Sequence, residues 1–317
     1  MLRQFVWMLV VCAAAFCGVA GAQPFPVKPV RIVTSGVGSS NDFNARTIAQ
    51  GISTPLAQQV IVENRGSGIL PTEYVAKSAP DGYTLLMVGA GLWIAPILQK
   101  TSYEAIRDFL PISLTNKSSP FLVVHPSIPA KNVKDLIGLA KTRPGVLNYS
   151  SGGTGTGSHL AGELFKSMAG VDIVRIHYKA DAQEKGDLLA GYVQMTFGFG
   201  SAVIPLVKSG KLKILGAGGA QPSPLLPGVP TIASSGLPGY EAAATFGLYA
   251  PARTPDVIIQ RLSHEVVTYL KTAEMRERFL STGSEVVASS SDELAAFMKS
   301  DFARWSKLIK EAGIKGE

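Results

Sequence analysis

The chain contains few residues of the kinds that enzymes most often use for chemistry. Its 317 residues include 2 cysteines and 4 histidines, and 17% of the side chains are charged. Both cysteines, Cys12 and Cys17, lie in an apolar stretch near the N-terminus, so the rest of the chain can form no disulfide and no thiolate metal site. No two histidines are spaced as zinc ligands on one helix turn.

The short motifs of common catalytic sites are also missing. A phosphate-binding loop would end in Gly-Lys-Ser or Gly-Lys-Thr, but here Gly157 is followed by Ser158 and His159. The dinucleotide spacing G-x-G-x-x-G and the nucleophile motif G-x-S-x-G do not occur in this region or elsewhere in the chain. We therefore expect no catalytic residue, no metal site and no cofactor.

The N-terminus has the pattern of an export signal. Arg3 precedes an apolar run over residues 5–19, and small residues follow up to Ala22. This order is typical of a cleavable signal peptide, and the run is shorter than the ~20 residues that span a membrane. We predict a signal peptide at residues 1–22 and a mature chain of residues 23–317.

Positive charge exceeds negative charge but is not concentrated. The formal net charge is +7, and lysines and arginines are scattered over the sequence. A nucleic-acid surface would need clustered cations interleaved with aromatic residues. The pattern favours a solvated basic face, and we expect no nucleic-acid partner.

Strand and helix patterns alternate along most of the chain, which is typical of α/β layers. Strands are expected at 30–33, 60–64, 84–88, 122–125, 146–149, 172–176, 193–197 and 213–215. Helices are expected at 45–56, 72–78, 132–141, 160–168, 184–190 and from 291 to about 313, and Pro255 is expected at the first position of another. We predict two α/β lobes, with residues 123–243 inserted between residues 23–122 and 244–317.

Four glycines and several hydroxyls separate a predicted strand from a predicted helix at residues 150–159. Such a loop leaves the first N–H groups of the helix free, and the helix dipole favours an anion beside them. A second interpretation is purely structural: a tight turn in which Ser158 caps the helix. This segment alone does not decide between the two.

Two further small-residue loops follow predicted strands. Residues 35–41 have the same order of strand, Gly/Ser loop and helix, and Gly89-Ala90-Gly91 follows the strand at 84–88. In open α/β sheets, ligands bind beyond the carboxyl ends of the strands. Two lobes with donor-rich loops at that edge predict a cleft that closes on a small anion.

Longer segments carry a resemblance to a known family. Val62-Glu63-Asn64-Arg65, the segment 79–86, Val124-His125-Pro126-Ser127 and the segment 158–170 resemble the Bug family. Its members are periplasmic substrate-binding receptors of tripartite tricarboxylate transporters. The resemblance implies a two-lobed type II periplasmic-binding fold that closes like a flytrap, a small carboxylate ligand, a membrane permease as partner, a monomer and a periplasmic location.

Three loops depart from the family pattern. Serines replace a glycine pair near Ser39, Asp181 replaces a small residue, and Phe197-Gly198-Phe199-Gly200 replaces a Phe-Asp-Asn segment. The departures predict a ligand with an apolar or aromatic body that stacks on Phe199, unless Phe199 packs in the core. Asp42 matches the family aspartate, and we expect it to satisfy N–H groups in the first helical turn in preference to touching the ligand.

The predicted ligand-binding residues lie in the loops described above. They are Ser35, Gly36, Gly38, Ser39, Ser40, Asn41, Ala90, Gly91, Gly152, Gly153, Thr154, Gly155, Thr156, Ser158, Asp181, Gly198 and Phe199. Two other functions remain open: an adaptor that presents the closed form to a membrane sensor kinase, and a periplasmic hydrolase, which the missing catalytic motifs disfavour.

Overall fold

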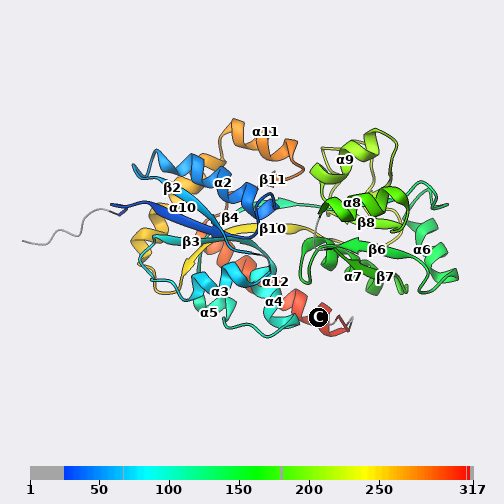
Figure 1. Ribbon diagram of the computed structural model, residues 1–317, viewed down its shortest axis with the longest axis horizontal. Coiled ribbons are helices and arrows are strands. Elements are labelled where there is room, and N and C mark those ends of the chain that lie inside the picture. The colour runs from blue at the N-terminus through cyan, green and yellow to red at the C-terminus, as the bar shows by residue number, and fades with distance from the viewer. Residues whose placement is uncertain (1–24, 67, 179–180, 312, 315–317) are drawn as a thin grey trace, which may run out of the picture.

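The computed structural model describes residues 25–66, 68–178, 181–311 and 313–314. The predicted signal peptide lies outside these residues. Two β-sheets, each flanked by helices, lie side by side along the long axis of the molecule (Figure 1). The prediction of an α/β chain with two lobes is confirmed.

The first lobe is built on a six-stranded sheet in the order β11-β4-β10-β3-β1-β2. Strands β1, β2 and β3 are parallel, whereas β10 runs antiparallel to both β3 and β4. The strands are β1 (Val30–Thr34), β2 (Val60–Asn64), β3 (Thr84–Gly89), β4 (Phe109–Ser118), β10 (Ala244–Pro251) and β11 (Glu285–Val286).

The second lobe repeats this plan with five strands in the order β7-β6-β8-β5-β9. Strands β6, β7 and β8 are parallel, and β5 runs antiparallel to β8 and β9. The strands are β5 (Phe121–Val124), β6 (Asn148–Ser151), β7 (Val174–His177), β8 (Met195–Gly198) and β9 (Lys213–Ala217).

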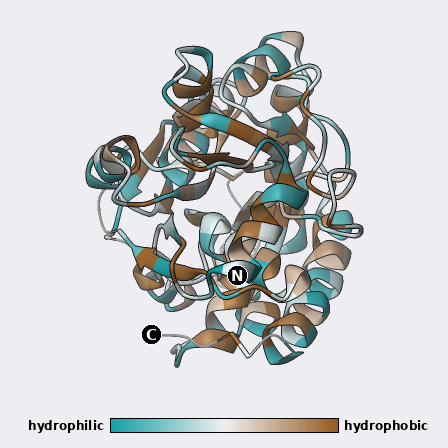
Figure 2. Ribbon diagram, turned by 90° about the vertical axis from the view of Figure 1, so that its right-hand side faces the viewer, coloured by the Kyte–Doolittle hydropathy of each residue, from teal (hydrophilic) through white to brown (hydrophobic). Residues whose placement is uncertain are grey.

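The helices cover the faces of both sheets. Figure 2 shows that they carry both hydrophilic and hydrophobic segments, as expected for amphipathic helices packed on a sheet. In the first lobe they are α2 (Ser40–Ser53), α3 (Leu70–Ala76), α4 (Gly91–Leu98), α5 (Ala105–Asp108), α10 (Asp256–Leu270), α11 (Ala273–Ser281) and α12 (Ser291–Glu311). In the second lobe they are α6 (Val133–Thr142), α7 (Gly157–Ala169), α8 (Asp181–Ala190) and α9 (Gly200–Lys208).

The chain passes from the first sheet to the second between β4 and β5, and returns between β9 and β10. The lobe boundary expected after residue 122 falls inside β5, which belongs wholly to the second sheet. Strands β4 and β10 make the longest pairing and lie near the centre of Figure 1. These connections tie the two lobes together at their junction.

Apolar packing also crosses the junction. Leu160, from α7 of the second lobe, is buried in a core cluster of the first lobe that includes Leu92 and Leu98. Leu308, from α12, packs against the core clusters of both lobes. The lobes therefore share part of their hydrophobic packing in this arrangement.

Two details of helix starts differ from the prediction. Helix α7 begins at Gly157 with Thr156 as its N-cap, so Ser158 is the second helical residue and not the cap. Pro255 is the N-cap of α10 and not its first residue. Within the described part of the chain, no helix has both the length and the apolar character that crossing a membrane requires.

Candidate functional site

The predicted loops follow the strands at the topological switch point of each sheet, where the strand order reverses. In the first sheet β1 lies between β2 and β3, and in the second sheet β6 lies between β7 and β8. The loops after β1 and β3, and after β6 and β8, therefore flank the two switch points where open α/β sheets bind ligands. We call residues 35–39, after β1, loop 1, and residues 152–156, after β6, loop 2.

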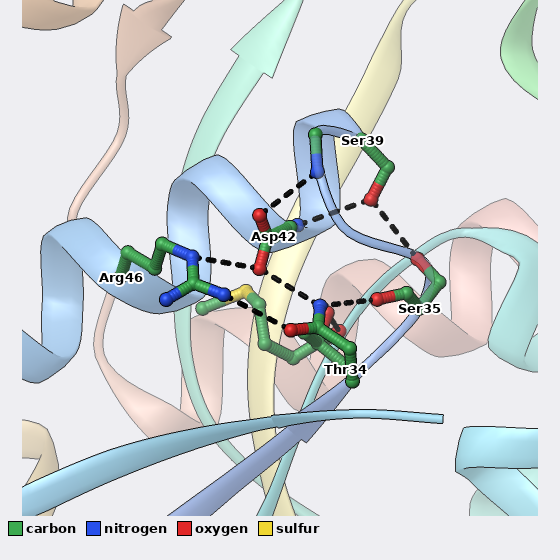
Figure 3. Close-up of polar contacts among 8 residues, drawn as sticks. Thr34, Ser35, Ser39, Asp42 and Arg46 are labelled. Atoms are coloured by element: carbon green, nitrogen blue, oxygen red, sulfur yellow. Dashed lines mark hydrogen bonds and ion pairs between the residues drawn. The ribbon is translucent and has the colours of Figure 1, made fainter. Parts of the chain in front are cut away.

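A network of polar side chains fixes loop 1 (Figure 3). Asn64, the last residue of β2, donates its amide N–H to the carbonyl oxygen of Ser35 at 2.6 Å and to Oδ1 of Asp42 at 2.8 Å. Asp42 Oδ2 accepts the N–H of Gly38 at 2.9 Å, and the Ser39 hydroxyl accepts the N–H of Asp42 at 3.2 Å. The loop is therefore fixed by contacts within the protein.

The carboxylate of Asp42 is buried and makes its hydrogen bonds to groups of the protein. The residue is 4% exposed. Burial alone would raise its pKa, but hydrogen bonds from Arg46, the Gly38 N–H and Asn64 outweigh it and lower the pKa below the ordinary 3.8. The carboxylate is thus ionised at neutral pH and fully engaged, which agrees with the structural role expected for it.

The first lobe presents free N–H groups at two helix N-termini. In α2, Ser40 and Asn41 donate their backbone N–H to no acceptor among the described residues, and in α4 the same holds for Gly91 and Leu92. Helix N-termini leave such groups free and carry partial positive charge. Asn41 adds an amide whose N–H donates to the Ser35 hydroxyl at 2.9 Å.

Loop 2 is fixed by one cation from the neighbouring strand. Arg175 of β7 donates to the Ser151 hydroxyl at 2.7 Å, the Gly152 carbonyl at 2.9 Å and the Thr154 hydroxyl at 3.2 Å. Nδ1 of His159, which is 2% exposed, accepts the N–H of Gly155 at 3.0 Å. Both ends of the loop are held by side chains outside it.

Loop 2 and the start of α7 also leave backbone N–H groups free. The backbone N–H groups of Gly153, Thr154, Gly157 and Ser158 have no acceptor among the described residues. The Ser158 hydroxyl accepts the N–H of Gly152 at 3.2 Å and lies 3.4 Å from the Thr156 hydroxyl. This group of donors is suited to an anion.

The loop after β8 meets the start of α7 and the first lobe. A Cβ atom on Gly157 would lie 2.8 Å from Cζ of Phe199 and 3.1 Å from Cβ of Ala244, which opens β10. A Cβ on Gly200 would lie 2.9 Å from Cα of Gly283 in the first lobe. Only glycine at positions 157 and 200 permits these approaches.

Asp181 opens α8, but its side chain lies outside the described residues. The neighbouring Tyr178 is buried and donates its hydroxyl to Oδ2 of Asp187 at 2.8 Å. Burial and this bond raise the pKa of Tyr178 to about 12, so the hydroxyl remains a donor at neutral pH. The contact joins the end of β7 to α8.

Asn64 and Arg175 were not predicted as site residues. Each stands on the parallel strand beside the loop-bearing strand: Asn64, the last residue of β2, pairs with Thr34, and Arg175, the second residue of β7, pairs with Tyr149. A polar residue in an apolar strand is the only signal in the sequence, and the loop that it contacts is known only once the strand register is known.

An open groove of about 680 Å³ lies elsewhere, between α10 and the start of α12. Its walls include Asp256, Asp292 and Glu293, which would repel an anion. It belongs to the first lobe alone and does not touch loop 1 or loop 2. Among the described residues no group of histidine, cysteine, aspartate and glutamate side chains is arranged to hold a metal.

Comparison with known proteins identifies the family. Residues 44–314 match the model of the tripartite tricarboxylate transporter family receptor, TctC. The chain belongs to this family. Protein BugT of Bordetella pertussis is 30% identical over 311 residues, which cover 96% of this chain and 95% of BugT. A protein of Pseudomonas sp. strain P51, from the tcbD-tcbE intergenic region, is 32% identical over 292 residues, or 90% and 87% of the two chains.

Solved structures of family members share the fold. An R. palustris protein solved with adipate has a TM-score of 0.85 and 32% identity, covering 92% of this chain and 100% of that one. The periplasmic binding protein BugD has a TM-score of 0.82 and 30% identity, with coverage of 92% and 100%. MatC from Rhodopseudomonas palustris, solved with bound malate, has a TM-score of 0.81 and 27% identity, with coverage of 90% and 100%. The expected two-lobed periplasmic-binding fold is confirmed.

Proposed function

We propose that this TctC receptor captures a small carboxylate between its two lobes, at the switch points of the two sheets. The observation that carries the proposal is the group of free N–H donors at loop 2 and the start of α7. Hydrogen bonds to a carboxylate are about twice as strong as neutral ones, so several uncharged donors can hold it. Two similar proteins bind adipate and malate, which are carboxylates.

The remaining predicted residues complete the site in this proposal. Loop 1 and the start of α4, around Ala90 and Gly91, would supply donors from the first lobe, and Gly198 and Phe199 would form a wall from the second. Closure would bring both sets of donors onto the ligand, with the second lobe, from β5 to β9, moving against the first. Asp181 would lie at the rim.

Family membership supports a proposal for the cellular role. The receptor would be exported by its signal peptide, act as a monomer in the periplasm without a cofactor, and deliver its ligand to the membrane permease of a tripartite tricarboxylate transporter. The relatives of known structure include a periplasmic binding protein and a periplasmic transporter, which supports this location and this role.

Binding of carboxylates to a matched pair of variants tests the proposal. A Cβ on Gly153 would have its nearest neighbour, Nε2 of His177, 3.9 Å away, so Gly153→Val should fold but block an anion that approaches the loop. Gly138→Val, at an exposed position of α6 with no atom within 4 Å, is the control. A ligand that binds only the folded state raises the melting temperature.

We expect at least one of adipate, malate, citrate and phenylacetate to raise the melting temperature of the wild type and of Gly138→Val. Gly153→Val should show no rise. If phosphates or sugars stabilise the protein and no carboxylate does, the ligand class is wrong. If Gly153→Val binds as well as the wild type, loop 2 has only a structural role.

A further inference from the structure

Phe199, which follows β8, lies outside the hydrophobic core, whereas Phe197, two residues earlier in β8, lies inside it. Phe197 is 1% exposed and packs against Phe165 in the core of the second lobe. Phe199 is half-buried and belongs to none of the four core clusters that the described residues form. Core packing therefore does not explain an aromatic residue at this position.

The ring of Phe199 rests against the first residue of α7. A Cβ atom on Gly157 would lie 2.8 Å from Cζ of the ring and 3.4 Å from Cε2. Such distances are too short for a real side chain, so the ring can occupy this place only because residue 157 is glycine. The ring is thus seated directly beside the free N–H groups of Gly157 and Ser158.

The surroundings of the ring are apolar on the side of the first lobe as well. The same Cβ position on Gly157 would lie 3.1 Å from Cβ of Ala244, so the corner between the lobes is lined by a methyl group and an aromatic ring. Loop 1 carries Val37, whose side chain is 77% exposed. Apolar groups therefore stand next to anion donors in the segments proposed to hold the ligand.

We propose that Phe199 determines specificity by selecting carboxylates whose acid group is attached to an apolar body, aryl or alkyl, over hydroxylated ones. The inference depends on the carboxylate site proposed above. An acid group held at the start of α7 would place its adjacent carbons on the ring, where an apolar body gains contact. A hydroxyl there would lose water without gaining a partner.

Phenylacetate and mandelate test this inference, because they differ by one hydroxyl on the carbon beside the carboxylate. Isothermal titration calorimetry would give Kd for both acids, and for malate, with the wild type, Phe199→Leu, Phe199→Ser and Gly157→Ala. Phe302→Ser, which removes a 38% exposed ring from α12, is the matched control.

The wild type and Phe302→Ser should bind phenylacetate about 10-fold tighter than mandelate. Phe199→Ser should weaken phenylacetate by about 10-fold and abolish the preference, whereas Phe199→Leu should keep most of it. Gly157→Ala, which displaces the ring, should also reduce the preference. If Phe199→Ser does not fold, Gly157→Ala carries the test.

Two results would overturn the selection by Phe199 while leaving the carboxylate site intact. One is tighter binding of malate or mandelate than of phenylacetate by the wild type. The other is a preference for phenylacetate that survives undiminished in Phe199→Ser, or in Gly157→Ala where Phe199→Ser does not fold. Failure of every carboxylate to bind the wild type would instead reject the proposed function.

Discussion

Loops 1 and 2 occupy equivalent places in the two lobes, but they are held in different ways. Two groups fix loop 1: the neutral amide of Asn64 and the buried carboxylate of Asp42. Arg175 fixes loop 2 with a guanidinium that makes three hydrogen bonds. A loop ordered by a cation is the better anchor for an anion, so the comparison favours the second lobe as the first point of attachment for a carboxylate.

The largest expected effect comes from removing the two fixing side chains. Arg175→Ala loses three charge-assisted hydrogen bonds and should weaken carboxylate binding by about 100-fold. Asn64→Ala loses the bonds to Arg46, Ser35 and Asp42 but removes no positive charge from the site, and it should weaken binding by about 10-fold. Arg143→Ala, at an exposed position of the second lobe, should have no effect. Isothermal titration calorimetry would measure Kd for the three variants. A larger loss of affinity in Asn64→Ala than in Arg175→Ala would contradict the comparison.

A smaller effect is expected from the carboxylate of Asp42, which lies in the first turn of α2 and fixes loop 1. Asp42→Asn should lower the free energy of unfolding by about 2 kcal/mol at pH 7, because hydrogen bonds to a charged acceptor are lost. The pKa of Asp42 is lowered in the folded state, so its contribution is complete above the unfolded pKa and disappears as pH falls through the folded one.

Urea unfolding between pH 7 and about pH 3 measures this contribution. The difference between wild type and Asp42→Asn should be constant near neutrality and shrink below the ordinary value of 3.8. Asp172→Asn, which changes an exposed carboxylate of the second lobe, should show no comparable difference. A gap that stays constant to the lowest pH would show that the charge of Asp42 does not stabilise loop 1.

The smallest expected effect concerns the helix caps behind the two loops. Ser39 accepts the N–H of Asp42, whereas Thr156, the N-cap of α7, makes no such bond. Ser39→Ala should therefore cost about 1 kcal/mol of unfolding free energy, and Thr156→Ala only a few tenths. Equal losses in urea unfolding would show that the two N-termini are built alike.

The sequence predicted all five strands of the second sheet and the parallel strands β1, β2 and β3 of the first, but it missed β4, β10 and β11. β1, β2 and β3 and their partners in the second lobe follow the alternation of strand and helix. β4 contains Pro111 and β10 contains Gly247, residues that usually weaken a strand, and their pairing has two irregularities in register. Long-range pairing supports these strands, and it cannot be read from local patterns.

Helices with an internal proline were missed for a similar reason. Pro96 lies inside α4 and Pro205 inside α9, although proline normally ends a helix because it lacks an N–H. In α4, Leu92, Trp93 and Ile94 are buried, and this packing supports a helix that local propensity would not favour. Tertiary packing, and not local propensity, therefore determines that these segments are helical.

The candidate site was predictable as a set of loops but not as a set of contacts. Glycines and hydroxyls between strand and helix located loop 1 and loop 2. The fixing roles of Asn64 and Arg175 depend on which strands are neighbours and on their register. Phe199 contacts Gly157 although the two residues are 42 positions apart in the sequence, so this contact could not be predicted from a local pattern.

A crystal structure of the protein with the carboxylate that raises its melting temperature most is the most direct test of the central claim. We expect a carboxylate oxygen about 3 Å from backbone N–H groups of Gly153, Thr154, Gly157 or Ser158, with loop 1 closing from the other lobe. A carboxylate bound away from loop 2, or a ligand at loop 2 without an acid group, would contradict the account.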